Sequence, residues 1–215
     1  MRHSPAELIA LARQYYPGIG VTPSTPEYRQ TAEYRRIVER RRQAITTADY
    51  EVWRGLLRRL RDRFPECDVE NAFPHFWAAG PVGAHVGGIR LPTLARDVGF
   101  HSLAFGVSFL VPYYVLHSYR YLFCDEPDGH GNLFPPAERR IELTPEEQPY
   151  ADGIAREIEV AFPGYELMPP ELGYVVVPYV QHPLRCAGEA TIYDCLIDDL
   201  TIPPKTPPEP TQSHR

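Results

Sequence analysis

The segment spanning residues 102–124, SLAFGVSFLVPYYVLHSYRYLFC, carries no charged side chain in its first 18 residues and has the clearest strand pattern in the chain. Every odd position from 103 to 115 is large and apolar, whereas the even positions begin small, with Ala104, Gly106 and Ser108. Because alternate residues of a strand face opposite sides, this pattern predicts one buried face. Pro112 lacks a backbone donor, so the segment is either one long central strand or a bent pair of strands.

Further elements follow on either side of this segment. The sequence LVPYYV at residues 110–115 is echoed by VVPYV at residues 176–180, so we expect another strand over residues 174–180 and a last one over residues 190–200. Shorter strands are predicted at residues 84–91 and 140–143. Apolar residues at spacings of three and four predict a long helix from about residue 149 to 162, which ends at a proline and a glycine.

The first 65 residues are predicted to be helical. Ser4 and Glu7 form a capping-box pattern that starts a first helix. A second helix is expected from residue 26 to about residue 44, and a third after Thr46. In the third helix, apolar residues at spacings of three and four form one stripe that we expect to pack on the sheet: Tyr50, Trp53, Leu57, Leu60 and Phe64.

This order of elements indicates an α+β fold, with N-terminal helices packed on a mainly antiparallel sheet and one further long helix late in the chain. We expect a single domain over residues 1–201, with a helical part at 1–65 and a sheet-rich part at 66–201. Residues 202–215 are rich in proline and poor in apolar side chains, which predicts a flexible tail.

Composition limits the class of protein. The chain of 215 residues is 43% hydrophobic and has no apolar run typical of a membrane span or a secretory signal, so we expect a cytoplasmic globular protein. Arginine supplies all but one of the 22 basic residues, and together with 24 prolines this favours a bacterial genome rich in G and C. Residues 1–65 hold 13 arginines against 7 acids, whereas the remainder holds 9 basic residues against 21 acids, so the two parts suit partners of opposite charge.

Candidate catalytic residues are few. His101 and His117 bracket the central strand segment, and with Asp194 they would supply a base and an orienting acid if the fold brought all three together. The cysteines and histidines match no zinc spacing, and the glycines of residues 80–88 lack the lysine of a phosphate-binding loop. We therefore predict no metal and no cofactor.

Two groups of acids are the candidate partner-binding residues. One lies in a turn-rich loop after the central segment, and the other lies near the predicted end of the last strand. Electrostatic steering by such groups would favour a basic partner. The six residues are Asp125, Glu126, Asp128, Asp194, Asp198 and Asp199.

These features leave three hypotheses. The first is a non-enzymatic protein-binding protein of the bacterial cytoplasm, in its concrete form an immunity protein that neutralises a cognate toxin, with a basic toxin or nuclease domain as the partner and no membrane partner. The second is an enzyme built around His101, His117 and Asp194. The third is a nucleic-acid binder that uses the arginine-rich helices. Acids interleaved with those arginines, such as Glu39 and Asp62, make this third hypothesis less favoured than the first.

Overall fold

The structure of the protein, a computed structural model, describes residues 2–23, 25–46, 48–71, 83–93, 99–122 and 138–197. These residues form helices and strands in the order α1 (Pro5–Ala12), α2 (Pro26–Gln30), α3 (Ala32–Thr46), α4 (Ala48–Arg63), β1 (Asp68–Asn71), β2 (Ala84–Leu91), β3 (Gly99–Ser108), β4 (Tyr113–Leu122), β5 (Glu138–Arg140), α5 (Gln148–Ala161), β6 (Glu166–Leu167), α6 (Pro170–Gly173) and α7 (Ile192–Leu196). The predicted α+β class is confirmed.

The strands form one sheet in the order β1-β2-β3-β4-β5, in which every neighbouring pair is antiparallel. The short β6 adds a parallel pairing to the start of β4. The central segment is the bent pair of strands, β3 and β4. Its turn is held by Ser108, whose hydroxyl accepts from the amides of Leu110 and Val111 at 3.0 and 3.2 Å.

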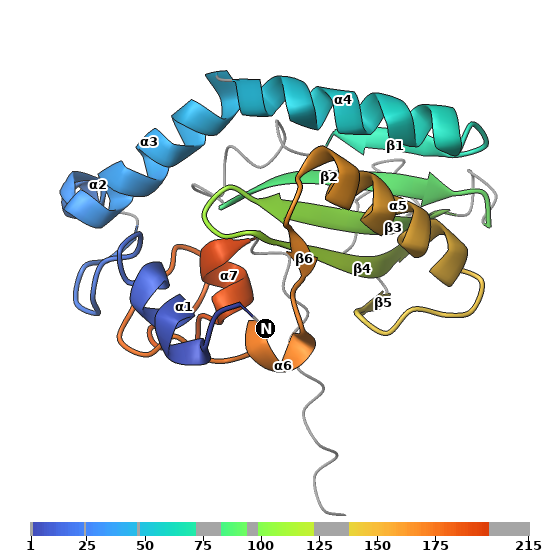
Figure 1. Cartoon of the computed structure of the whole chain (residues 1–215). Helices are drawn as coiled ribbons and strands as arrows, with labels where there is room; N and C mark the ends of the chain where they lie inside the picture. Colours follow the sequence, from blue (N-terminus) through green and yellow to red (C-terminus); the bar gives the residue numbers. More distant parts are fainter. Residues whose placement is uncertain are drawn as a thin grey trace, which may run out of the picture.

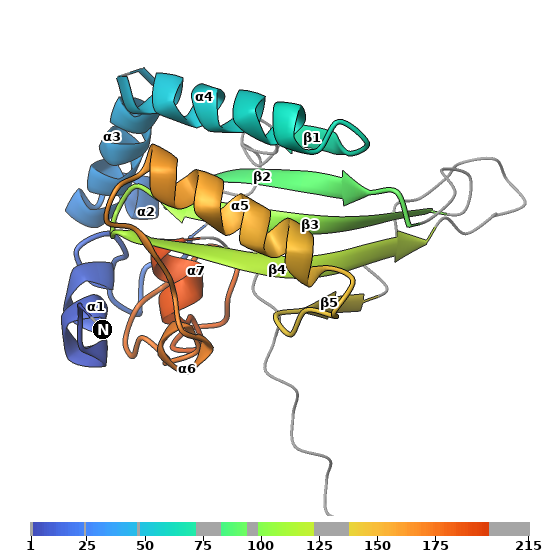
Figure 2. The same ribbon diagram turned by 45° about the vertical axis from the view of Figure 1, so that its right-hand side comes forward.

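Helices cover both faces of the sheet (Figures 1 and 2). On one face, which we call the α4/α5 face, Trp53, Leu57 and Leu60 of α4 are buried with Leu103 and Phe105 of β3. The predicted stripe of the third helix is therefore confirmed. On the opposite, α1/α7 face, residues of α1 and α7 are buried with the turn and the start of β4. Two hydrophobic cores thus lie on either side of a shared sheet.

Three local predictions are wrong. The predicted second helix is interrupted at Thr31, whose hydroxyl donates to the Tyr28 carbonyl at 2.8 Å and accepts from the Tyr34 amide at 3.2 Å, so it ends α2 and starts α3. Residues 174–180 form single bridges rather than a strand, because Pro178 has no donor and Tyr179 has a φ of 64°.

The predicted last strand, residues 190–200, is also corrected, because it contains the helix α7. The Thr191 hydroxyl accepts from the Asp194 amide and the Asp194 carboxylate accepts from the Thr191 amide, which is a capping box that begins a helix. Among the helices that the structure describes, none is long and apolar enough to cross a membrane.

Candidate functional site

The Glu147 carboxylate, just before α5, lies at the centre of a buried hydrogen-bond cluster in the sheet-rich part. One of its oxygens, Oε1, lies 2.5 Å from the Ser118 hydroxyl, 2.6 Å from Nε2 of His101 and 2.8 Å from the Arg140 guanidinium. The other oxygen, Oε2, accepts from the Thr144 amide at 2.7 Å. Glu147, His101 and Ser118 are all buried.

This cluster contains a serine, a histidine and a carboxylate, as a catalytic triad does, but its hydrogen bonds differ from those of a triad. The Ser118 hydroxyl donates its proton to Glu147, so it has no proton to give to His101 as a nucleophile must. Burial acts to raise the pKa of Glu147, but the bonds from Ser118, the Thr144 amide and His101, and the charge of Arg140, outweigh it, so the pKa lies below its usual range. The cluster therefore holds a charged carboxylate that fastens α5 to β4 and β5.

The structure does not bring together the three predicted catalytic residues. In the β3–β4 register, His101 faces Arg120 and His117 faces Ala104, which places the two histidines in opposite parity. Because side chains alternate along paired strands, His101 lies on the α4/α5 face and His117 on the α1/α7 face. The sheet itself separates the two rings, so they do not line one pocket.

Asp194, which belongs to both the predicted partner-binding set and the predicted catalytic set, lies in the interior of the protein. It is 2% exposed, and its carboxylate accepts from the Arg185 guanidinium at 2.8 Å and from the Thr191 hydroxyl at 2.7 Å. The carboxylate is used inside the fold because it both caps α7 and pairs with Arg185. The other five predicted acids lie outside the described residues: Asp125, Glu126, Asp128, Asp198 and Asp199.

Most arginines of the N-terminal helices are engaged within the fold. On α3, Arg36 donates to the Gln14 carbonyl, Arg40 donates to the Phe109 carbonyl at 2.6 Å, and Arg41 is buried. On α4, Arg59 and Arg63 pair with Glu157 of α5 at 2.9 and 3.3 Å. These arginines therefore join α3 to the body of the protein and α4 to α5.

A different row of arginines on α4 lines a pocket. Arg54, Arg58 and Arg61 follow one another at spacings of four and three, so they lie along one side of the helix, and all three are exposed. The pocket has a volume of about 330 Å³ between α4 and the end of β1, and Tyr50, Leu57 and Asn71 complete its lining. Arg54 pairs with Glu51 at 2.9 Å, whereas Arg58 forms no ion pair with any residue that the structure describes. We call this site the arginine groove.

The arginine groove lies against the outer edge of the sheet, because β1 is the first strand in the sheet order. The Val69 carbonyl points out of the sheet, since it accepts from the Arg61 guanidinium at 3.2 Å. Alternate residues of a strand direct their backbone groups to the same side, so Asn71 also presents its amide and carbonyl outward. The groove thus combines three cations with the backbone of an edge strand.

Trp53 fixes the geometry of this site from the interior. Its indole nitrogen donates to the Asn71 side chain at 3.2 Å, and its ring stacks on His85 of β2 with centroids 5.1 Å apart. These contacts hold the end of β1 under α4. The end of β1 therefore forms the floor of the groove, beside the arginine side chains of α4.

The sequence alone indicated the arginines but not the groove. Their positions off the apolar stripe are visible from residue 50 onwards, but β1 has no apolar alternation that would distinguish it from a loop. No protein-family model, curated protein or solved structure matches the chain. Within the described ranges, no three histidine, cysteine or acidic residues are grouped so that they could hold a metal ion.

Proposed function

We propose that the protein is a non-enzymatic protein-binding protein that takes an acidic, extended segment of its partner into the arginine groove. The observation that carries the proposal is the position of Arg54, Arg58 and Arg61 beside the outer edge of β1. An extended segment that lies along this edge would pair its backbone with Val69 and Asn71, as in strand addition to an open sheet. Its carboxylates would meet the guanidinium groups, which bind carboxylates in a forked geometry.

The spacing of the arginines supports an extended partner. Residues four apart on a helix are separated by about 6 Å along its axis. Residues two apart on a strand are separated by about 6.7 Å and point to the same side. A segment with acids at alternate positions therefore matches the row from Arg54 to Arg58, while apolar residues between them point away from the cations.

The charge of this groove changes the expected partner. The basic partner predicted from the sequence relied on six acids, of which Asp194 is interior and the others lie outside the described residues. The proposal relies instead on a positive site, which selects an acidic segment. If the protein neutralises a toxin, as one form of this proposal, the toxin contributes that acidic strand.

A nucleic acid is the competing partner, because arginines also bind phosphates. Tight binding of a duplex commonly uses six to ten phosphate contacts, roughly. Three arginines line the groove, while Arg36, Arg40 and Arg41 of α3 are bonded or buried. The open backbone of β1 offers both carbonyls and amides, which is complementary to a peptide, whereas a phosphate could use only the amides.

The test is a fluorescence polarisation titration with a labelled peptide of alternating glutamate and valine, at low and at moderate salt. Arg54→Glu and Arg58→Glu should each weaken binding at least about tenfold, roughly 1.4 kcal/mol. Arg42→Glu is the matched control, because Arg42 is an exposed arginine of α3 that pairs with an acid three residues earlier, as Arg54 does. It should bind like the wild type.

Strand addition has its own readout. Val69→Pro removes an outward amide while leaving the inward bonds of Asp68 and Glu70 to β2, so it should also weaken binding. A peptide N-methylated at alternate residues tests the same bonds without changing the protein. Peptide binding that is insensitive to both changes, or a single-stranded oligonucleotide that binds more tightly than the peptide through the same arginines, would overturn the proposal.

A further inference from the structure

The opposite edge of the sheet contains a gap in its backbone pairing. Along the outer edge of β4, β6 pairs with Tyr113 and Tyr114, and β5 pairs with residues 118–120. Leu116 lies between these two short strands and is paired to neither of them. Residues 115–117 are therefore unpaired on this edge, between the two short strands, and Leu116 is the middle one.

The backbone groups of Leu116 point into this gap. The Tyr114 carbonyl points outward, because it accepts from the Met168 amide at 2.9 Å, and Leu116 is two residues further along the same strand. The pairing of β3 leads to the same result. The Phe109 amide bonds the Gly83 carbonyl on the β2 side, so Phe105, four residues earlier, also directs its backbone groups to β2. Phe105 faces Leu116 in the register, and the two residues therefore exchange no backbone hydrogen bonds. Leu116 has no partner in the β4–β5 or β4–β6 register, and among the described residues no turn or loop bond reaches its amide or carbonyl.

This open pair of backbone groups is unusual because Leu116 is only 6% exposed. More than about nine in ten buried backbone groups in native proteins have a hydrogen-bond partner. A donor and an acceptor that are buried side by side without partners therefore indicate a ligand or ordered water. The two groups have the arrangement that a peptide unit presents to its neighbour across a sheet.

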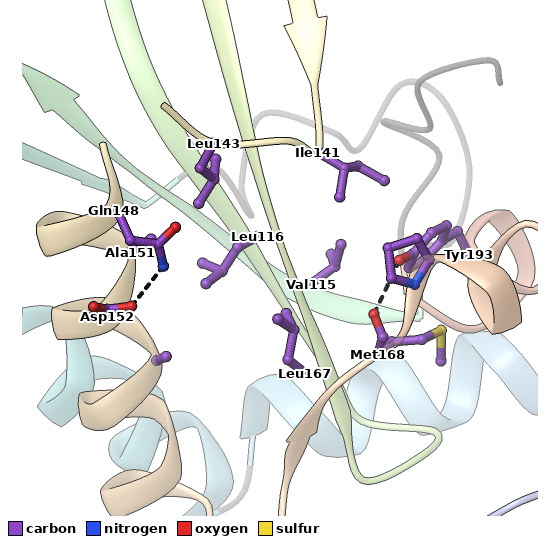
Figure 3. Close-up of a pocket in the computed structure, with 12 residues that line it drawn as sticks. Val115, Leu116, Ile141, Leu143, Gln148, Ala151, Asp152, Leu167, Met168 and Tyr193 are labelled. Carbon is purple, nitrogen blue, oxygen red and sulfur yellow. Dashed lines mark hydrogen bonds between the residues drawn. The ribbon is translucent and has the colours of Figure 1, made fainter. Parts of the chain in front are cut away.

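A pocket of about 230 Å³ surrounds the gap. Figure 3 shows Ile141 and Leu143 on one side of Leu116 and Leu167 and Met168 on the other. The polar residues at the rim are bonded to near neighbours: Gln148 donates to Asp152 at 2.7 Å and Tyr193 donates to the Met168 carbonyl at 3.2 Å. The lining is thus apolar around one backbone donor and one backbone acceptor.

We infer that this pocket is a binding site for a small, neutral amide with a branched apolar body, of the size of one capped amino acid. The amide would donate to the Leu116 carbonyl and accept from its amide, while the apolar body fills the space between Leu143 and Leu167. A longer extended peptide does not fit along this edge, because β5 and β6 occupy it on both sides. Pockets for drug-sized ligands are usually larger, roughly 300–1,000 Å³, which also selects a compact ligand.

The inference is independent of the proposed function, since the arginine groove lies at β1, on the other edge of the sheet. The probe is N-acetyl-leucinamide, titrated into the ¹⁵N-labelled protein and followed by the amide resonances. A saturable shift of the Leu116 amide is expected, together with shifts in the methyl groups of Leu143 and Leu167. The residues of α4 should not respond.

Two comparisons make the experiment decisive. The acetoxy analogue of the probe replaces its leucine N–H by oxygen, so it should bind at least several-fold more weakly. Ala155→Phe fills the pocket from α5 and should abolish the response, whereas Val160→Phe, at a site that is 65% exposed on the same helix, should not change it.

The inference is overturned if the probe gives no saturable shift at Leu116, which would leave ordered water as the occupant of the gap. Equal binding of the amide and the acetoxy analogue would also overturn it, because the backbone pair of Leu116 would then have no role. Where Ala155→Phe does not fold, as its amide spectrum would reveal, the two probes alone decide the outcome on the wild-type protein.

Discussion

Replacing His85 by Phe or by Gln should remove much of the acid sensitivity of the fold. His85 is 1% exposed, and its ring stacks on Trp53 at an interplanar angle of 16°, with Tyr50 and Phe109 at centroid distances of 6.1 and 5.8 Å. An imidazolium in this aromatic site would lose its hydration, so burial lowers the pKa of His85 from 6.5 to about 4.

The sign and size of the effect follow from this difference. Between pH 6.5 and 4 His85 is protonated in the unfolded chain but neutral in the folded protein, so acidification favours unfolding. The folded protein therefore keeps its full stability with respect to His85 above about pH 6.5, and it loses this stability progressively as the pH falls towards 4. A gap of about 2.5 between the two pKa values corresponds to about 3.4 kcal/mol in full, and to roughly 2.5 kcal/mol at about pH 4.5.

Urea unfolding of the wild type and both variants, at about pH 7 and pH 4.5, measures this contribution. The wild type should lose roughly 2.5 kcal/mol more than either variant on acidification, whatever the stability of each variant at pH 7. Phe and Gln differ in polarity but neither titrates, so agreement between them isolates the proton. Equal losses in all three proteins, or an NMR titration of His85 with a midpoint near 6.5, would refute the reasoning.

Three other predictions concern packing and the buried carboxylate. Trp53→Ala should destabilise the fold by about 3 to 5 kcal/mol and Arg58→Ala by less than about 1, as measured by chemical denaturation, and equal small losses would contradict the packing of α4 described above. Gly153→Ala should destabilise by about 1 to 3 kcal/mol although alanine is the better helix former, because its Cβ would lie 2.4 Å from the Phe64 ring. Gly55→Ala should stabilise by about 0.5 to 1 kcal/mol, because its Cβ would meet no atom closer than the Arg59 guanidinium at 3.6 Å; a higher thermal unfolding midpoint for both variants would contradict the crowding at Gly153. Glu147→Gln should lower the free energy of unfolding by about 2 kcal/mol at neutral pH, whereas Glu146→Gln, at an exposed position, should change it little. Because the pKa of Glu147 is lowered, the stability advantage of the wild type should disappear in acid as the carboxyl is protonated. An advantage that persists in acid would argue against a charged Glu147 carboxylate in the folded protein.

The sequence predicted those helices and strands whose apolar side chains repeat with a regular period. The stripe from Tyr50 to Phe64 is confirmed, since it depends only on neighbours a few residues apart. The alternation at residues 103–115 correctly predicts strands, but the expectation of one buried face is wrong: Leu103, Phe105 and Val107 pack on the α4/α5 face, whereas the odd residues after the turn pack on the α1/α7 face. Patterns failed where one local interaction replaced another. Residues 190–200 contain apolar residues suited to a strand, but the capping box of Thr191 and Asp194 begins a helix instead.

The candidate sites depended on tertiary structure. The separation of His101 from His117 follows from a register set by pairing across β3 and β4, and one residue of slip would have changed it. The arginine groove needs β1 beside α4, and the gap at Leu116 needs two strands that stop short of each other on one edge. The sequence by itself determined which faces are apolar and where most helices begin, because those are short-range properties. Which polar groups share a site was decided by contacts between segments far apart in the chain, and no local period encodes those contacts.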